Sequence, residues 1–137
     1  MPYRAEAGTA FSPSGSRSMR VSVMALILTR MSDYFRKVER SAAFSPDKAV
    51  KSDLWAGERL FLGLNCFEPG QGQKVHAHAG ADKFYYVCSG RARLTVGEET
   101  REAGPGEIVW APAGVPHGVE TALERTILLV GIAPPPG

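Results

Sequence analysis

Short segments in which apolar and polar residues alternate fill most of this 137-residue chain after about residue 45. In Arg91–Val96 (RARLTV) every second residue is apolar, which is typical of a strand with one buried face. Lys83–Ser89 (KFYYVCS) has the highest β-propensity in the chain, and strand alternation places Lys83, Tyr85 and Val87 on one face. The pattern predicts about eight short strands, little helix, and an all-β barrel or jelly roll.

Glycine and proline, with 15 and 10 residues, separate these segments, as many short turns require. The predicted strands are Lys48–Trp55, Arg59–Phe67, Lys74–His78, Lys83–Ser89, Arg91–Val96, Thr100–Ala103, Glu107–Ala111, His117–Thr121 and Arg125–Ile132. The first two are predicted to form a hairpin through Ala56-Gly57-Glu58. We expect one barrel over residues 45–133, followed by a tail at 134–137 whose prolines cannot pair as a strand.

The segment 31–44 is predicted to lead into the barrel and to contain a short helix. Tyr34, Val38 and Ala42 follow one another at helical spacing, and Ser32 or Asp33 could cap the helix. Residues 1–30 show no periodicity, and we expect a disordered or over-translated extension that the barrel does not need.

The apolar run Val21–Leu28 within that extension has eight residues, whereas a membrane span needs about 20. Arginines precede it as in a signal peptide, but Thr29-Arg30-Met31 offers no small-residue cleavage site. We therefore favour Met31 as the natural start over a targeting segment, and we expect a cytoplasmic protein with no membrane partner.

Charge and cysteine content bear on possible partners and on disulfide formation. The chain has a net charge of +2. Residues 1–30 carry a net charge of +3 and residues 31–137 a net charge of −1. A nearly neutral body without a lysine or arginine cluster argues against a nucleic-acid partner. Cys66 and Cys88 lie in apolar runs and are interpreted as small hydrophobic residues rather than as a disulfide.

The three histidines of the chain all fall within one stretch of 48 residues, Gly70–His117. His76 and His78 are one residue apart, so in a strand both imidazoles point to the same side. His117 follows Pro116 at the start of another strand, and Pro112, Gly114 and Pro116 shape the turn that directs it inward. Three imidazoles in this arrangement predict a metal site with open coordination positions.

The same stretch resembles the two motifs of the cupin superfamily, G-x5-H-x-H-x(3,4)-E-x6-G and G-x5-P-x-G-x2-H-x3-N. The matching positions are Gly70, His76, His78 and Gly90 in the first motif and Gly106, Pro112, Gly114 and His117 in the second. Lys83 stands where the first motif has glutamate, and Thr121 where the second has asparagine. The resemblance implies a single small cupin β-barrel, a double-stranded β-helix, over roughly residues 45–133.

A small metal-dependent enzyme is the leading hypothesis, and the resemblance to single-domain cupins is compatible with it. A divalent Mn, Fe, Ni, Co or Zn ion on His76, His78 and His117 would serve an isomerase, lyase or dioxygenase. The ligand would be a small polar molecule bearing a carbonyl or carboxylate group. A non-catalytic small-ligand-binding or structural cupin is the alternative, and a homodimer is compatible with either.

Lys83 leaves two interpretations open. If it faces the cavity, it binds an anionic or carbonyl group or acts with Tyr85 as a catalytic residue; otherwise it leans outward and pairs with an acid such as Asp82. Asp82 is a minor candidate metal ligand, because it could replace the missing glutamate only if the preceding loop bulges. The other aromatic residues of this region, Phe84, Tyr86 and Trp110, are predicted to lie in the core.

Overall fold

The computed structural model describes residues 34–136, so the extension predicted over residues 1–30 lies outside the described part of the chain. The chain divides into two units, Met1–Lys37 and Val38–Gly137, and every strand of the described residues belongs to the second. No helix of the described residues is long and apolar enough to cross a membrane.

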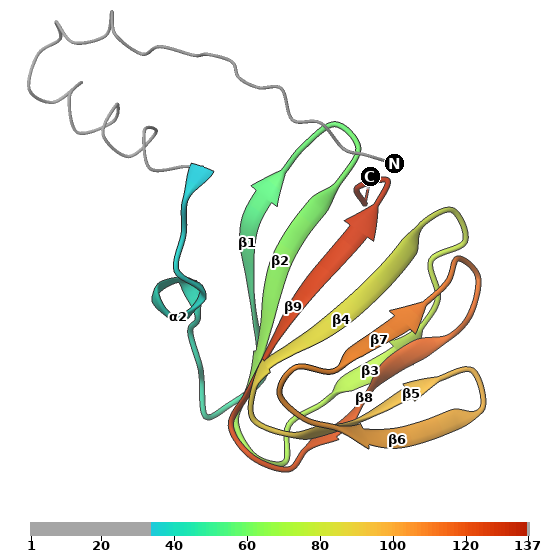
Figure 1. Ribbon diagram of the computed structural model, residues 1–137. Helices are drawn as coiled ribbons and strands as arrows, with labels where there is room; N and C mark the ends of the chain where they lie inside the picture. The colour runs from blue at the N-terminus through green and yellow to red at the C-terminus, as the bar shows by residue number, and fades with distance from the viewer. Residues whose placement is uncertain (1–33, 137) are drawn as a thin grey trace, which may run out of the picture. The chain divides into compact units, whose positions relative to one another are not determined.

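The second unit is built from two antiparallel sheets (Figure 1). The strands are β1 (Val50–Ala56), β2 (Phe61–Phe67), β3 (Gln73–His76), β4 (Asp82–Ser89), β5 (Ala92–Val96), β6 (Glu99–Ala103), β7 (Ile108–Ala111), β8 (His117–Ala122) and β9 (Thr126–Ala133). One sheet has the order β1-β2-β9-β4-β7 and the other β3-β8-β5-β6. The all-β prediction is confirmed, and each strand begins and ends within two residues of the predicted bounds.

The main core lies where the inner faces of the two sheets meet. Tyr85 and Val87 of β4 and Leu128 of β9 face inward from one sheet, and Leu94 and Val119 face them from the other. The predicted alternation along β4 is confirmed, since Lys83, Tyr85 and Val87 are all buried. One strand therefore supplies both apolar core and a buried cation.

A second apolar cluster covers the outer face of the five-stranded sheet, around Leu64, Cys66 and Ile127. Val38 and Ala42 of the lead-in segment pack on it, but the helix that carries Val38, α2, spans only Val38–Ser41. The helix covers only part of the predicted segment, and Phe44 beyond it also packs on this cluster. Cys66 and Cys88 are free thiols in this cluster, Cys66 buried and Cys88 partly buried.

The prediction that Tyr86 and Trp110 lie in the core is wrong. Tyr86 is 37% exposed and Trp110 57% exposed. Alternation turns these residues to the outer face of the sheet, where Trp110 pairs with the half-buried Phe84 across β4 and β7. Apolar composition alone does not distinguish an inner from an outer face.

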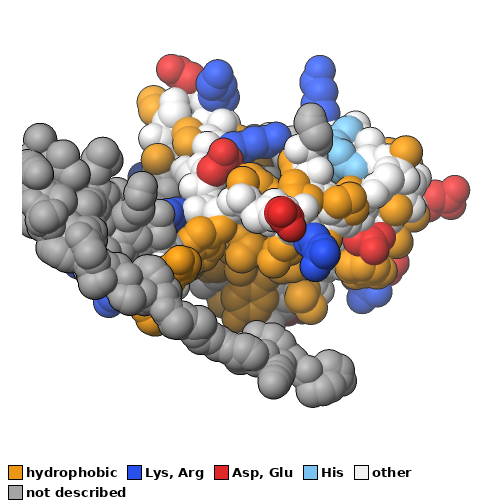
Figure 2. Space-filling model, turned by 90° about the horizontal axis from the view of Figure 1, so that it is seen from above, with side chains coloured by type: hydrophobic (Ala, Val, Ile, Leu, Met, Phe, Trp, Pro, Cys, Tyr) orange, Lys and Arg blue, Asp and Glu red, His pale blue; other side chains and the backbone are white. Residues whose placement is uncertain are grey.

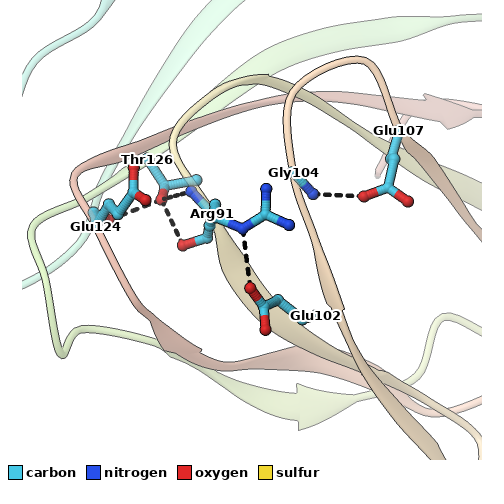
Figure 3. A network of polar contacts seen from close by, with 6 residues as sticks. All are labelled: Arg91, Glu102, Gly104, Glu107, Glu124 and Thr126. Atoms are coloured by element: carbon cyan, nitrogen blue, oxygen red, sulfur yellow. Dashed lines mark hydrogen bonds and ion pairs between the residues drawn. The ribbon is translucent and has the colours of Figure 1, made fainter.

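The crossing of the chain from one sheet to the other is held by a buried threonine (Figure 3). The backbone N–H of Arg91 donates to Thr126 Oγ1 at 3.1 Å, and Thr126 Oγ1 lies 3.0 Å from the Arg91 carbonyl and 2.7 Å from the Glu124 carbonyl. These bonds join the β4–β5 turn to the β8–β9 turn. Nearby, Arg91 Nε donates to Glu102 at 2.8 Å and the Gly104 N–H donates to Glu107 at 2.6 Å.

Gly90 allows this crossing, and we predict that Gly90→Ala destabilises the fold by about 2–4 kcal/mol. Gly90 has φ +86°, and an added Cβ would fall on the Arg125 carbonyl and 2.6 Å from Thr126 Cα. Gly80→Ala is the matched control, since a Cβ there meets nothing within 4 Å and the change should stay within about 0.5 kcal/mol. Chemical denaturation of both variants checks this, and equal stabilities would contradict it.

Candidate metal centre

The three histidines converge because β3 pairs with β8. His76 and His117 are opposite each other in this antiparallel pair, and His78 follows two residues after His76. Gly118 permits the close approach of the two strands, since a Cβ there would lie 2.7 Å from the Gln73 carbonyl oxygen. The pairing thus brings residues about 40 positions apart to one point.

The imidazole rings form a tight triangle. Their centroids are 4.9 Å apart for His76 and His78, 4.6 Å for His76 and His117, and 5.4 Å for His78 and His117. One nitrogen from each ring lies within 4.8 Å of the others. The structure therefore brings together the three histidines that the sequence singles out.

Backbone carbonyls fix the protonation of two of these rings. His76 Nδ1 lies 2.9 Å from the Lys74 carbonyl oxygen, and His117 Nδ1 lies 2.9 Å from the Val115 carbonyl oxygen. A carbonyl oxygen only accepts, so each Nδ1 carries the proton and each neutral ring keeps its lone pair on Nε2. This is the arrangement in which histidine ligates a metal.

His117 Nε2 is the clearest sign that a partner belongs here. It is a buried side-chain nitrogen without a hydrogen-bond partner among the described residues. An unsatisfied buried polar atom is costly, and an ion at the centre of the triangle would satisfy it. The donor set therefore fits a divalent metal ion.

Burial favours the neutral form of His78 and His117. It lowers the pKa of His78 and of His117, and the neighbouring positive charge of Lys83 lowers both further. His76 also contributes to the lowering for both residues when it is protonated. Because ligation requires neutral imidazole, these shifts favour metal binding at neutral pH.

A cavity of about 450 Å³ opens next to the triangle. His76 and His78 line one side, and residues of β1, β2, β3, β4 and β9, among them Lys51, Asn65 and Lys83, line the rest together with Pro136. Histidine side chains are visible at the surface in Figure 2, so the site is accessible from that face. A cavity of this size admits a small molecule.

Lys83 faces this cavity, as the first of the two interpretations predicted. Its side chain is 4% exposed, and Nζ lies 4.7 Å from the centroid of the Tyr85 ring. Burial, and secondarily Lys51, lowers the pKa of Lys83 to about 8. The ammonium has no acid partner among the described residues, so the alternative in which it leans outward and pairs with Asp82 is excluded.

Tyr85 and Asp82 are not among the residues that line the cavity. Tyr85 is buried behind the cavity wall, its hydroxyl donates to Gln73 Oε1 at 2.9 Å, and burial raises the pKa of its phenol. Asp82 is exposed and accepts the Ala113 N–H at 2.9 Å, away from the imidazole triangle.

Sequence reasoning missed six polar residues that line the cavity: Lys51, Ser52, Asp53, Asn65, Gln73 and Lys74. Asn65 is the lone polar residue of the otherwise apolar β2, a signal that could have marked it. It is 6% exposed, and Lys51 lies opposite it across the β1–β2 pair. The proximity of Lys51 and Asn65 could not be predicted from the sequence, because it depends on the register of the two strands.

A second hollow of about 300 Å³, between the β5–β6 hairpin and β7, offers no comparable chemistry. Its charged residues pair with one another or with neighbours: Arg101 with Glu99 at 2.6 Å, and Glu102 with Arg91 at 2.8 Å. Because these groups are already satisfied, the histidine cavity is the candidate site.

The two-sheet barrel and its histidine triangle together define a cupin. A family model described as a cupin domain matches residues 63–130. The uncharacterized protein SCO3923 of Streptomyces coelicolor is 41% identical over 103 residues, which cover 74% of this chain and 95% of that protein. This chain belongs to the cupin superfamily.

Solved structures agree with this assignment. The protein TT1209 of Thermus thermophilus is 41% identical, with a TM-score of 0.71, and the match covers 74% of this chain and 98% of that one. An RmlC-like cupin from Desulfovibrio desulfuricans is 28% identical with a TM-score of 0.64, over 69% of this chain and 91% of that one.

We predict that Lys83→Met stabilises the metal-free protein at pH 7 by on the order of 1–3 kcal/mol, because it removes a buried, unpaired cation. The pKa of Lys83 is about 8 in the fold and about 10.4 in an unfolded chain. Between pH 8 and about pH 10.4 the Lys83 side chain is protonated in the unfolded chain but largely neutral in the fold. The full destabilisation by Lys83 is therefore present below pH 8. The advantage of the variant should shrink as pH rises from 8 to above 10.

Urea denaturation with a chelator present, at pH 7 and pH 10, measures this difference. Lys74→Met is the control, because Lys74 lies at the same cavity but is exposed, and it should change stability by no more than about 0.5 kcal/mol. A Lys83→Met variant less stable than wild type at pH 7 would show that the ammonium has a stabilising partner.

Proposed function

We propose that this chain is a metal-binding cupin and a small metal-dependent enzyme of the isomerase, lyase or dioxygenase type. Its ligand is a small polar molecule bearing a carbonyl or carboxylate group. The observation that carries the proposal is the convergence of three imidazoles on one point, with His117 Nε2 buried and unpartnered among the described residues.

His76, His78 and His117 would hold a divalent Mn, Fe, Ni, Co or Zn ion through three nitrogens, which leaves coordination positions open for a ligand. Such an ion polarises a carbonyl or enediol oxygen and, as iron, supports oxygen chemistry. Lys83, with a pKa of about 8, can hold or release a proton near neutral pH at the cavity wall. Tyr85 acts indirectly, because its hydrogen bond orients the Gln73 side chain.

Metal content tests the site directly. Protein purified without chelators should carry close to one divalent ion per chain, and His76→Ala or His117→Ala should remove most of it. Asp82→Asn is the control, since the Asp82 carboxylate accepts the Ala113 N–H and should not affect occupancy. Elemental analysis measures all four proteins. A metal-free wild type that shows no thermal shift with any of the five ions would refute the metal site.

Acidification should release the metal, because protons compete for the imidazole lone pairs. The pKa values of His78 and His117 lie below the ordinary value of about 6.5, so occupancy should persist at pH 7 and fall below about pH 6. Dialysis at stepped pH followed by elemental analysis measures the midpoint. Full occupancy at pH 4 would mean that imidazole nitrogens are not the ligands.

Turnover assays separate the reaction types. Iron-loaded protein that consumes oxygen with a catechol-like compound or a keto acid would identify an oxygenase. Anaerobic conversion of a uronate or keto acid with manganese or zinc would identify an isomerase or lyase.

A non-catalytic binding cupin is the second candidate, and Lys83 is the observation that favours it. The usual cupin carboxylate at this position is replaced by a cation, which cannot ligate a metal while it is protonated. Ligand-induced thermal stabilisation without turnover under any metal would support this candidate over the enzyme.

A further inference from the structure

We infer that the cavity binds a small organic acid, with its carboxylate on Lys83 and a hydroxyl or oxo group directed at the histidine triangle. This inference rests on the proposed function, because the second contact is with the metal centre. It makes Lys83 the residue that determines ligand charge.

The first support is the unpaired state of Lys83. The side chain is only 4% exposed, yet its ammonium has no hydrogen bond or ion pair among the described residues. Its Nζ lies over the face of the Tyr85 ring, 4.7 Å from the ring centroid. A buried cation without a counter-charge is unfavourable, and an anion that enters the cavity would supply that charge.

The second support is the charge of the cavity as a whole. Three lysines, Lys51, Lys74 and Lys83, line it, against the single acid Asp53 among the described residues. Neutral imidazoles do not offset this excess, and a bound divalent ion would increase it. A concave site with one sign of charge attracts ligands of the opposite sign.

The third support is a pair of carboxamides. Asn65 is 6% exposed and makes no hydrogen bond with its side chain among the described residues, although it lines the cavity. Gln73 uses Oε1 to accept the Tyr85 hydroxyl, which leaves its Nε2 hydrogens for the cavity. Such donors suit the oxygens of a carboxylate or a hydroxyl group.

One small molecule can contact Lys83 and the histidine triangle, because Lys83, His76 and His78 line the same cavity. Lys83 Nζ lies 4.7 Å from the centroid of the Tyr85 ring, and that centroid lies 6.2 Å from the centroid of the His117 ring. Lys83 and the triangle thus flank the same cavity of about 450 Å³. A hydroxy or oxo acid, or a longer sugar acid, carries a carboxylate for Lys83 and a second oxygen for the triangle.

Matched acid and amide pairs test the inference. Isothermal titration of the metal-loaded full chain would use glycolate, lactate, pyruvate and gluconate, each against its primary amide. At least one acid should bind 10-fold or more tightly than its amide, which is about 1.4 kcal/mol. Lys83→Met should abolish that preference, whereas Lys48→Met, at an exposed lysine that does not line the cavity, should retain it.

Lys83→Glu should change acid binding and metal binding in opposite directions, which loss of folding would not do. It should weaken acid binding further than Lys83→Met and hold the metal more tightly, because it restores a carboxylate beside the imidazoles. If no acid is preferred over its amide while metal is bound, the carboxylate inference fails and the proposed metal site stands. If the preference survives in Lys83→Met, another group binds the acid and the assignment is overturned.

The same titration of metal-free protein separates the two proposals. If the chain binds no metal, the proposed function fails, and a preference for acids that depends on Lys83 would still support the carboxylate contact. Equal binding of acids and amides in that protein as well would overturn both.

Discussion

The candidate site depends on the antiparallel pairing of β3 with β8. This pair sets His76 opposite His117, and the two strands can approach closely because Gly118 has no side chain. A shift of one residue in this register would turn the His76 side chain to the opposite face and break up the triangle. The Lys74 and Val115 carbonyls, each two residues before its histidine, then fix which nitrogen stays bare. Strand pairing and the choice of ligand atom are thus parts of one local geometry.

The barrel accommodates this site by placing polar groups in positions where a core would be apolar. Along β4, Lys83 takes the inward position next to Tyr85 and Val87, and on β2 Asn65 lies between the buried Leu64 and Cys66. Neither Lys83 nor Asn65 has a side-chain hydrogen-bond partner among the described residues. Polar groups in these positions reduce the apolar core at this end of the barrel, so the proposed ligand site would lower the stability of the fold.

The fold and the histidines could be predicted from sequence because their signals are local. Alternation along Arg91–Val96 and the spacing of His76 and His78 are properties of one strand, and the spaced glycines and prolines fix its ends. Alternation also placed Lys83 inward. Lys51 and Asn65 escaped prediction because their proximity arises across a strand pair, and Trp110 was misplaced because composition does not reveal which face is covered.

The lysine at position 83, where the cupin motif has glutamate, changes the charge of the site and therefore the kind of ligand expected there. In the usual cupin motif a glutamate at this position offsets part of the charge of the ion, whereas here a lysine adds to it. The described residues around the cavity offer only the exposed carboxylate of Asp53 in return. Neutral imidazoles contribute no charge, so an occupied centre would remain strongly positive until a ligand enters. With lysine in place of glutamate at position 83, the protein would not neutralise the occupied site, and a bound anion would have to do so. This is the physical reason to expect an acid there.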